Sequence, residues 1–153
     1  MKVVKPYNNE KNKKEQVTKM FNNIANSYDF LNHSLSLGMD NVWRKIAIKK
    51  IDNNPKRILD IATGTADFAI TAAKYTDAHI TGIDISDGML DIGRKKIRKK
   101  KLEKRITLKN ADSECLPFSD NSFDAVIAGF GVRNFENLNK GLSEIFRVLK
   151  KMA

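Results

Sequence analysis

The stretch that decides the fold reads Arg57-Ile58-Leu59-Asp60-Ile61-Ala62-Thr63-Gly64-Thr65-Ala66-Asp67. It begins as an apolar run of strand character and ends in a turn of small residues, which leads into an amphipathic helical stretch at 68–75. A second apolar strand at 79–83 closes on an acid. The sequence therefore predicts a strand–turn–helix–strand unit with a carboxylate at the tip of each strand, Asp60 and Asp84.

The turn around Gly64 and the acid Asp84 together predict a nucleoside site. Glycine lets the backbone come close to a ligand, and the free N–H groups at the start of the following helix favour polar or negative groups. An acid roughly 20 residues past such a turn is placed to accept hydrogen bonds from both hydroxyls of a ribose. Asp84 stands at that position relative to Gly64.

Asp60 helps to choose among the nucleoside cofactors. A nicotinamide fingerprint requires Gly-x-Gly-x-x-Gly, whereas the corresponding positions here are Ala62, Gly64 and Ala66. The carboxylate of Asp60 would repel a pyrophosphate but would suit an ammonium group. S-adenosylmethionine carries an ammonium, a sulfonium and a ribose diol, which match the two acids. The alternative is a structural turn between two strands, with both acids merely solvated.

Composition narrows the class of protein. At 153 residues the chain fits one domain, and its apolar content of 41% is ordinary for a soluble globular protein. The lone Cys115 excludes an internal disulfide, and His33 and His79 lie far apart, so no metal site is expected. No apolar run reaches the ~20 residues that span a bilayer, and residues 1–14 lack the apolar core of a signal peptide. A cytoplasmic location is expected.

The net charge of +10 comes largely from two basic clusters, within residues 2–14 and 94–105. The second cluster falls on a predicted helix whose apolar residues recur at helical spacing: Met89, Leu90, Gly93 and Ile97. The simplest interpretation is a solvated helix face. Peripheral contact with an anionic membrane surface is a second interpretation. Binding to nucleic acid is less favoured, because no aromatic residues interleave with the lysines.

The chain divides into three predicted parts: a disordered basic tail at 1–13, an N-terminal helical cap or lid at 14–54, and the nucleoside-binding domain at 55–153. In the cap, apolar residues at helical spacing predict a helix from Lys14 to Asn26 and another that begins at Asp40. The segment 27–38 between them fits neither a helix nor a strand. It is either a lid over a substrate or a structural cap on the sheet.

The domain continues with further strands and helices. A third strand at 106–109 leads to Asp112 and Ser113, and a fourth at 123–128 leads to Gly129. A last helix carries apolar residues on one face: Leu138, Leu142, Ile145, Phe146 and Leu149. Strands that alternate with helices predict an α/β fold with a doubly wound, Rossmann-like parallel sheet. Ligands of such sheets bind at the carboxyl ends of the strands, where Asp60, Asp84, Asp112 and Gly129 stand.

Four blocks of sequence carry a resemblance to a known family. They are Met20-Phe21-x-x-Ile24-Ala25-x-x-Tyr28-Asp29-x-Leu31-Asn32 with Leu35-Ser36-x-Gly38 and Trp43-Arg44; Leu59-Asp60-x-Ala62-Thr63-Gly64-Thr65-x-Asp67; Gly82-Ile83-Asp84-Ile85-Ser86-x-Gly88-Met89-Leu90; and Leu116-Pro117-Phe118-x-Asp120-Asn121-Ser122-Phe123-Asp124 leading to Phe130-Gly131-Val132-Arg133-Asn134-Phe135. Over about residues 14–150 the chain resembles class I S-adenosylmethionine-dependent methyltransferases, specifically the ubiquinone/menaquinone biosynthesis C-methyltransferases. The first block and the stretch 130–135 are the most specific to these quinone enzymes.

The resemblance implies methylation of a ring carbon of a polyprenylated quinol, such as the conversion of demethylmenaquinol to menaquinol. It implies cofactor contacts at Asp60, Gly64, Thr65, Asp84, Asp112, Ser113 and Gly129. It also implies that Tyr28, Arg133 and Asn134 face the quinol. His33 and Asp29 are candidates for a general base only because they lie in the expected lid. Arg133 is expected to stabilise a phenolate.

The C-terminal end departs from the family pattern. The chain ends at Leu149-Lys150-Lys151-Met152-Ala153, where the family continues with Leu-Lys-Pro-Gly-Gly and three further strands. We therefore expect a C-terminal truncation and a sheet of four strands, with an exposed edge that favours a homodimer. Two alternatives stay open: a non-catalytic fragment that binds S-adenosylmethionine, and a nucleic-acid methyltransferase. Against the second, Gly129-Phe130-Gly131-Val132 stands where an Asn-Pro-Pro-Tyr motif would be needed.

Overall fold

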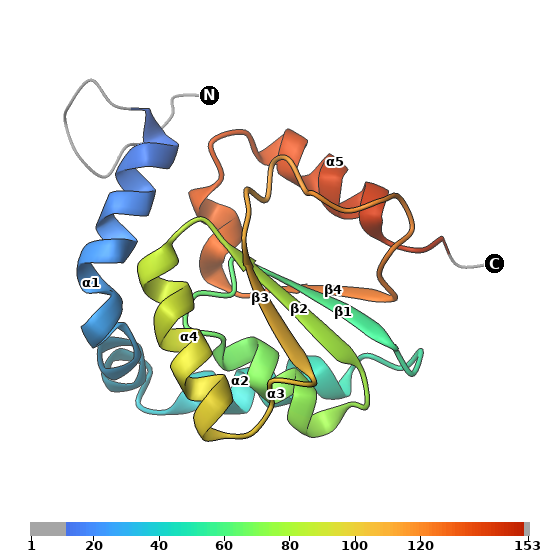
Figure 1. Cartoon of the computed structure of the whole chain (residues 1–153), viewed down its shortest axis with the longest axis horizontal. Helices are drawn as coiled ribbons and strands as arrows, with labels where there is room; N and C mark the ends of the chain where they lie inside the picture. The colour runs from blue at the N-terminus through green and yellow to red at the C-terminus, as the bar shows by residue number, and fades with distance from the viewer. Residues whose placement is uncertain (1–11, 152–153) are drawn as a thin grey trace.

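A computed structural model describes residues 12–151 (Figure 1). The elements follow one another along the chain as α1 (Lys13–Ser36), α2 (Met39–Lys49), β1 (Arg57–Ile61), α3 (Asp67–Tyr75), β2 (His79–Asp84), α4 (Asp87–Lys99), β3 (Ile106–Asn110), β4 (Ala125–Ala128), the 3-10 helix η1 (Phe130–Asn134) and α5 (Leu138–Val148). The N-terminal tail predicted for 1–13 lies outside the described residues except for Asn12 and Lys13, and Lys13 already belongs to α1.

The four described strands form one parallel sheet in the order β3-β2-β1-β4. Ile58 in β1 pairs with Ile80 on one side and with Ala125 on the other. Beyond α5, Leu149 pairs in parallel with Phe123 next to the start of β4. The doubly wound parallel sheet predicted from the sequence is confirmed.

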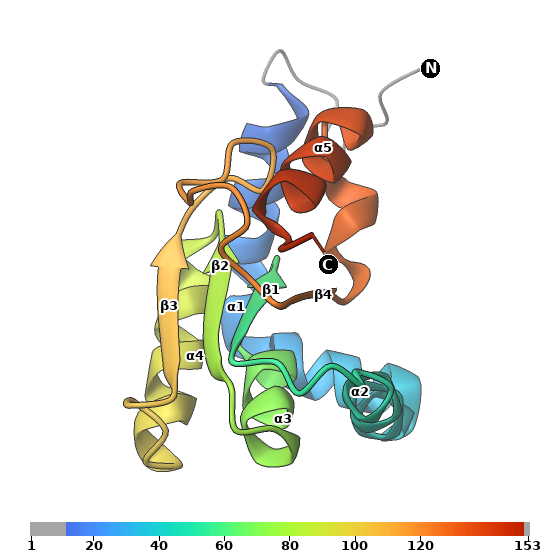
Figure 2. The same cartoon turned by 90° about the vertical axis from the view of Figure 1, so that its right-hand side faces the viewer.

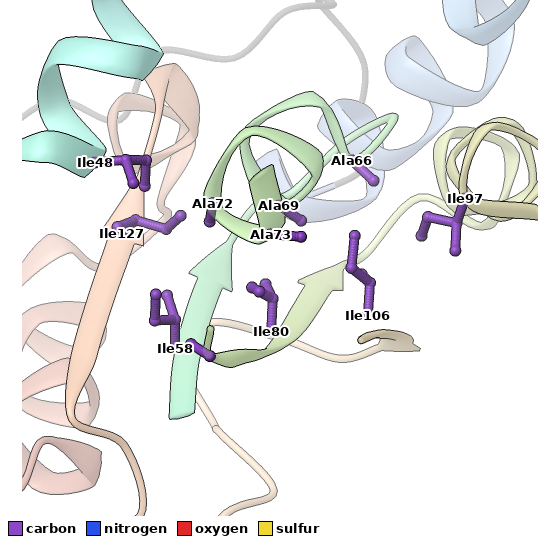
Figure 3. Close-up of a cluster of buried hydrophobic side chains, with 11 residues drawn as sticks. Ile48, Ile58, Ala66, Ala69, Ala72, Ala73, Ile80, Ile97, Ile106 and Ile127 are labelled. Atoms are coloured by element: carbon purple, nitrogen blue, oxygen red, sulfur yellow. The ribbon is translucent and has the colours of Figure 1, made fainter. Parts of the chain in front are cut away.

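One hydrophobic core lies between the sheet and the helices α2, α3 and α4 (Figures 2 and 3). Isoleucines from the strands meet a row of alanines on α3, whose small side chains let this helix pack close to the sheet. The buried members are Ile48, Ile58, Ala66, Ala69, Ala72, Ala73, Ala78, Ile80, Ile97, Ile106 and Ile127.

A second core covers the opposite face of the sheet, beneath α5 and the loop before β4. Because successive side chains of a strand point to opposite faces, Ile58 belongs to the first core and Leu59 to the second. Phe123 is completely buried there and meets Phe118 edge-on, with ring centres 5.1 Å apart. The sheet is thus covered on both faces, and its carboxyl edge carries the polar loops.

Short polar side chains cap the helices where the sequence suggests. Asn12 accepts from the backbone N–H of Glu15 at 2.8 Å, and Asn137 accepts from that of Lys140 at 3.0 Å. Ser86 caps α4 by accepting from the N–H of Met89 at 3.2 Å. The four apolar residues predicted on the inner face of α4 are all buried. No helix within 12–151 combines the length and the hydropathy that a membrane span requires.

One detail of the sequence interpretation was wrong. The segment 27–38 was expected to be neither helix nor strand, but α1 continues unbroken to Ser36. Tyr28, Leu31 and Leu35 extend the helical spacing of Phe21 and Ile24, and all five side chains line the same cavity. The residues after β4 form a 3-10 helix, which the pattern did not predict.

Helix α5 forms as predicted, but its apolar residues divide between the core and the surface. Leu138, Leu142 and Phe146 are exposed, and Phe146 is 72% accessible. The helix packs through Gly141, Ile145 and Val148.

The turn after β1 depends on close contact with η1. Ala62, Gly64 and Ala66 all have positive φ angles, of 52°, 58° and 69°. A Cβ atom on Gly131 would lie only 2.2 Å from the Cβ of Ala62, so η1 approaches this turn as closely as a bare backbone allows.

Gly131→Ala should therefore destabilise the chain by about 1–3 kcal/mol, the usual cost of overpacking. Urea unfolding followed by circular dichroism would measure the change. Ala62→Gly in the same chain removes the clashing Cβ and suits the positive φ at that position, so the double variant should recover most of the loss. A double variant as unstable as Gly131→Ala would refute this packing argument.

Candidate functional site

A cavity of about 650 Å³ opens at the carboxyl edge of the sheet. Its walls come from the turn after β1, the ends of β2, β3 and β4, the helices α1 and α2, and η1. All ten residues predicted for cofactor or substrate contact line it: Tyr28, Asp60, Gly64, Thr65, Asp84, Asp112, Ser113, Gly129, Arg133 and Asn134. The fold thus brings together positions that are scattered over the whole chain.

Asp60 lies at the floor of this cavity and is only 1% exposed. Its Oδ2 accepts a hydrogen bond from the hydroxyl of Thr63 at 2.6 Å. Burial, together with the negative charge of Asp84, raises the pKa of Asp60 to about 7 although the bond from Thr63 opposes the shift. Near neutral pH a carboxyl with this pKa is only partly ionised, and an approaching cation favours its charged form.

Asp84 is also buried, and the backbone orients it. Gly64 N–H donates to Oδ2 and Ser86 N–H donates to Oδ1, both at 2.9 Å. Burial raises the pKa of Asp84, and these backbone bonds limit the rise. Each carboxylate oxygen keeps a second lone pair, so both can still accept from the two hydroxyls of a ribose.

The pair Asp60 and Asp84 has no cationic partner of its own. Among residues 12–151, no lysine, arginine or histidine forms an ion pair with either carboxylate. Burying charge without a partner is costly, and a cationic ligand would remove that cost. The geometry fits a ligand with a positive group beside Asp60 and a diol beside Asp84.

The hydroxyl of Thr65 joins α1 to the turn after β1. It donates to Asp29 Oδ1 at 2.5 Å and accepts from the ammonium of Lys96 at 3.2 Å. Lys96 also binds Asp29 Oδ2 at 2.7 Å and forms an ion pair with Asp67. The cofactor contact expected of Thr65 stays a prediction, and its backbone and the remaining lone pair of its hydroxyl are the groups that can make it.

Asp112 is likewise engaged by α1. Lys14 donates to Asp112 Oδ2 at 2.6 Å and lies 3.6 Å from Glu114 Oε2, while the other oxygen of Asp112 accepts from the N–H of Glu114. The side chain of Asp112 keeps about a third of its surface exposed (33%). Asp112 can therefore accept a hydrogen bond from the edge of an adenine ring while Lys14 stays bound to the same carboxylate.

Asn22 makes the third set of contacts that hold α1 across the site. Asn22 Oδ1 accepts from the hydroxyl of Ser86 at 2.6 Å and from the N–H of Gly88 at 3.1 Å. Lys14, Asn22 and Asp29 therefore bind, in turn, the loops that follow β3, β2 and β1. Helix α1 lies beside α4 along this edge (Figure 1). Residues 14–36 form the roof of the cavity.

The residues expected to face the acceptor, Tyr28, Arg133 and Asn134, line the same cavity. Burial raises the pKa of Tyr28, which Arg44 partly offsets, so the phenol is neutral and can donate a hydrogen bond at neutral pH. Arg133 lies over the ring of Phe130, 5.6 Å from its centre. Apolar side chains from α1, α2, α3 and the segment of η1 also line the cavity: Phe21, Ile24, Leu31, Leu35, Trp43, Phe68, Phe130 and Phe135.

Neither candidate for the general base is free in this structure. Asp29 is held by Thr65 and Lys96. The imidazole of His33 lies 3.0 Å from Asp40 Oδ1 and does not line the cavity. In this structure Asp29 links α1 to α4 and the turn after β1, and His33 links α1 to α2.

Sequence reasoning missed several residues of the site. Arg44 lines the cavity, bonds to Asp40 at 2.9 Å and lies 3.8 Å from Asp67. Lys14 and Asn22 stand on the polar side of a helix, where nothing local separates them from solvated residues. The sequence could have indicated Arg44 as a residue of the site, because it directly follows Trp43 in the first family block.

Comparison with known proteins agrees with this geometry. Residues 9–152 match the model of the ubiE/COQ5 methyltransferase family. The demethylmenaquinone methyltransferase of Bacteroides fragilis is 50% identical over 149 residues, which are 96% of this chain and 61% of that protein. The chain thus spans about three fifths of the length of such relatives.

Two solved structures support the fold. The [4+2]-cyclase SpnF superposes with a TM-score of 0.78 at 24% identity, over 90% of this chain and 56% of that one. A phosphoethanolamine N-methyltransferase of Haemonchus contortus, solved with S-adenosylhomocysteine, gives a TM-score of 0.63 at 30% identity, over 70% of this chain and 26% of that one. The resemblance seen in the sequence motifs is confirmed, and the chain belongs to the ubiE/COQ5 methyltransferase family.

Proposed function

We propose that this chain binds S-adenosylmethionine and methylates a ring carbon of a polyprenylated quinol in menaquinone or ubiquinone biosynthesis. Demethylmenaquinol, converted to menaquinol, is the acceptor that the name of the Bacteroides relative suggests. The observation that carries the proposal is the cavity itself. Its lining combines two buried carboxylates, which have no ion-pair partner among residues 12–151, with aromatic and aliphatic side chains.

The residues present fit the cofactor. Asp60 would face its ammonium group, and Asp84 would hold the ribose hydroxyls. Asp112 and the backbone of Ser113 would meet the adenine edge, and Gly129 would lie near the methionine end. S-adenosylmethionine supplies an electrophilic methyl group on a sulfonium.

The protein then has to align a nucleophilic carbon and activate it. Holding the quinol between α1, α2 and η1 supplies proximity, which can contribute about 7–11 kcal/mol. A ring carbon becomes nucleophilic when the neighbouring hydroxyl loses its proton, and the guanidinium of Arg133 would stabilise the resulting phenolate. The neutral Tyr28 can donate a hydrogen bond to the same oxygen. The ring proton leaves once the new carbon–carbon bond has formed.

A nucleic-acid acceptor is less well supported. The exposed basic residues of α4 lie outside the cavity lining. Of the basic residues that do line it, Lys14 and Arg44 are already paired with Asp112 and Asp40. A polyanion would therefore find few free cations near the reacting groups. Pairing of two chains through a sheet edge stays a prediction.

Asp84→Ala should lower the affinity for S-adenosylhomocysteine by about 100-fold or more, because two hydrogen bonds to a charged group are lost at about 1.5–3 kcal/mol each. Isothermal titration calorimetry would measure it. Asp91→Ala removes an exposed acid of α4 and serves as the matched control, with unchanged affinity expected. Equal affinity of the Asp84 variant and the unsubstituted chain would refute the ribose assignment.

Affinity for S-adenosylhomocysteine should rise from about pH 5.5 and level off above about pH 8, roughly one unit above the pKa of Asp60. Asp60, with its pKa raised to about 7, must lose its proton to pair with the ligand's ammonium group. Asp84 shifts in the same direction. Calorimetry in buffers of different ionisation enthalpy would detect the released proton. Asp60→Asn should flatten the profile between pH 6 and 8, and an unaltered profile would contradict the role of Asp60.

Arg133→Gln should lower the rate of methyl transfer to a short-chain demethylmenaquinol by roughly 10²–10³-fold, the usual loss for one electrostatic contact to a developing anion. Affinity for S-adenosylhomocysteine should stay unchanged. Transfer of a labelled methyl group measures the rate, and Arg98→Gln on the exposed side of α4 is the control. If the unsubstituted chain binds S-adenosylhomocysteine but methylates no quinol, the acceptor assignment fails.

A further inference from the structure

Helix α2 exposes a stripe of large apolar side chains. Met39, Val42, Trp43 and Ile46 follow helical spacing, and each is 44–51% exposed. The opposite side of the same helix is packed, with Ile48 1% exposed. A helix that is apolar on both sides normally lies between two apolar layers. The outer side of α2 therefore lacks a partner among the described residues.

The stripe continues to the end of α1. Leu35 and Leu37 are 85% and 90% exposed, the two highest values among the large apolar residues. Leu35 and Trp43 also line the cavity, so this surface borders its mouth. We call Leu35, Leu37, Met39, Val42, Trp43 and Ile46 the α2 surface. Its members follow one another along the end of α1 and one side of α2, whereas exposed apolar residues are normally scattered singly.

A cluster of lysines borders the α2 surface. Lys45 and Lys49 follow Val42 by three and seven residues, so they lie along one side of the stripe. Together with Lys74 of α3, their ammonium groups lie 5.5 Å from the centre of the Tyr75 ring. None of the three forms an ion pair with a described carboxylate. Three cations thus converge beside an apolar stripe, at the side of the molecule where α2 and α3 lie together (Figure 2).

We infer that the α2 surface docks on an anionic phospholipid bilayer. An apolar stripe flanked by lysines is the pattern of helices that lie in a membrane interface. Lysine-rich borders are uncommon in protein–protein interfaces, whereas each lysine near an anionic lipid surface contributes about 1 kcal/mol. The apolar side chains enter the acyl region, and Lys45, Lys49 and Lys74 meet lipid phosphates. The net charge of +10 adds long-range attraction.

One consequence depends on the proposed function. The mouth of the cavity would face the bilayer, so a lipid-soluble quinol can enter between Leu35 and Trp43 without crossing water. Docking of the α2 surface on a bilayer does not require the proposed function, because it depends only on the apolar stripe and its lysines.

The only tryptophan of the chain, Trp43, lies on the α2 surface and reports docking directly. Its emission should shift to the blue on vesicles of equal parts phosphatidylcholine and phosphatidylglycerol, and brominated lipids should quench it. Vesicles of phosphatidylcholine alone should have little effect. The triple variant Lys45→Gln, Lys49→Gln, Lys74→Gln should bind the anionic vesicles about 100-fold more weakly.

A matched control carries Lys99→Gln, Lys100→Gln and Lys101→Gln, the same loss of charge at the exposed end of α4. It should lose much less binding. An equal loss in both variants, or no change of Trp43 emission on either kind of vesicle, would overturn the inference. A blue shift that grows with protein concentration without lipid would also overturn it, because a second copy of the chain would then occupy the surface.

Calorimetry with S-adenosylhomocysteine separates this inference from the proposed function. Vesicle binding without cofactor affinity would refute the proposed function and leave the docking intact. Cofactor affinity without vesicle binding would refute the docking alone.

Discussion

Two buried carboxylates, Asp60 and Asp84, end adjacent parallel strands, and the rest of the site depends on their burial. The register that pairs Asp60 with Gly82 leaves Asp84 two residues further along the neighbouring strand. Both carboxyls lie away from water, and both have raised pKa values. The backbone supplies N–H donors to Asp84 through a turn with three left-handed residues. Such an arrangement costs stability in the empty chain, and a cationic ligand with a diol would reverse that cost.

Helix α1 converts this acidic edge into an enclosed cavity. Its polar residues bind each of the three loops that end β1, β2 and β3, while its apolar residues line the cavity. One helix therefore contacts every part of the expected nucleoside site and also carries Tyr28. The network of Asp29, Thr65 and Lys96 makes the position of α1 depend on the turn after β1. If cofactor and acceptor bind as proposed, both would contact this helix.

Much of the fold could be predicted, because its signals are local. The unit 57–84 shows strand and helix periodicities, and the ends of parallel strands necessarily meet at one edge. The seven predicted cofactor residues line one cavity for that reason, whereas Tyr28, Arg133 and Asn134 were expected there from the family resemblance. The contacts of Lys14 with Asp112 and of Lys96 with Asp29 join residues 98 and 67 positions apart, which no local pattern encodes. The exposed stripes of α2 and α5 were missed because periodicity shows a shared face, not what covers it.

The most direct test of this account is a crystal structure of the chain with S-adenosylhomocysteine. The account predicts the ribose hydroxyls on Asp84, the ammonium group beside Asp60 and the adenine edge at Asp112 and Ser113, with α1 over the ligand. The contact between Lys14 and Asp112 should open or be shared with the adenine. A ligand bound elsewhere, or one that leaves Asp60 and Asp84 without contacts, would contradict the account.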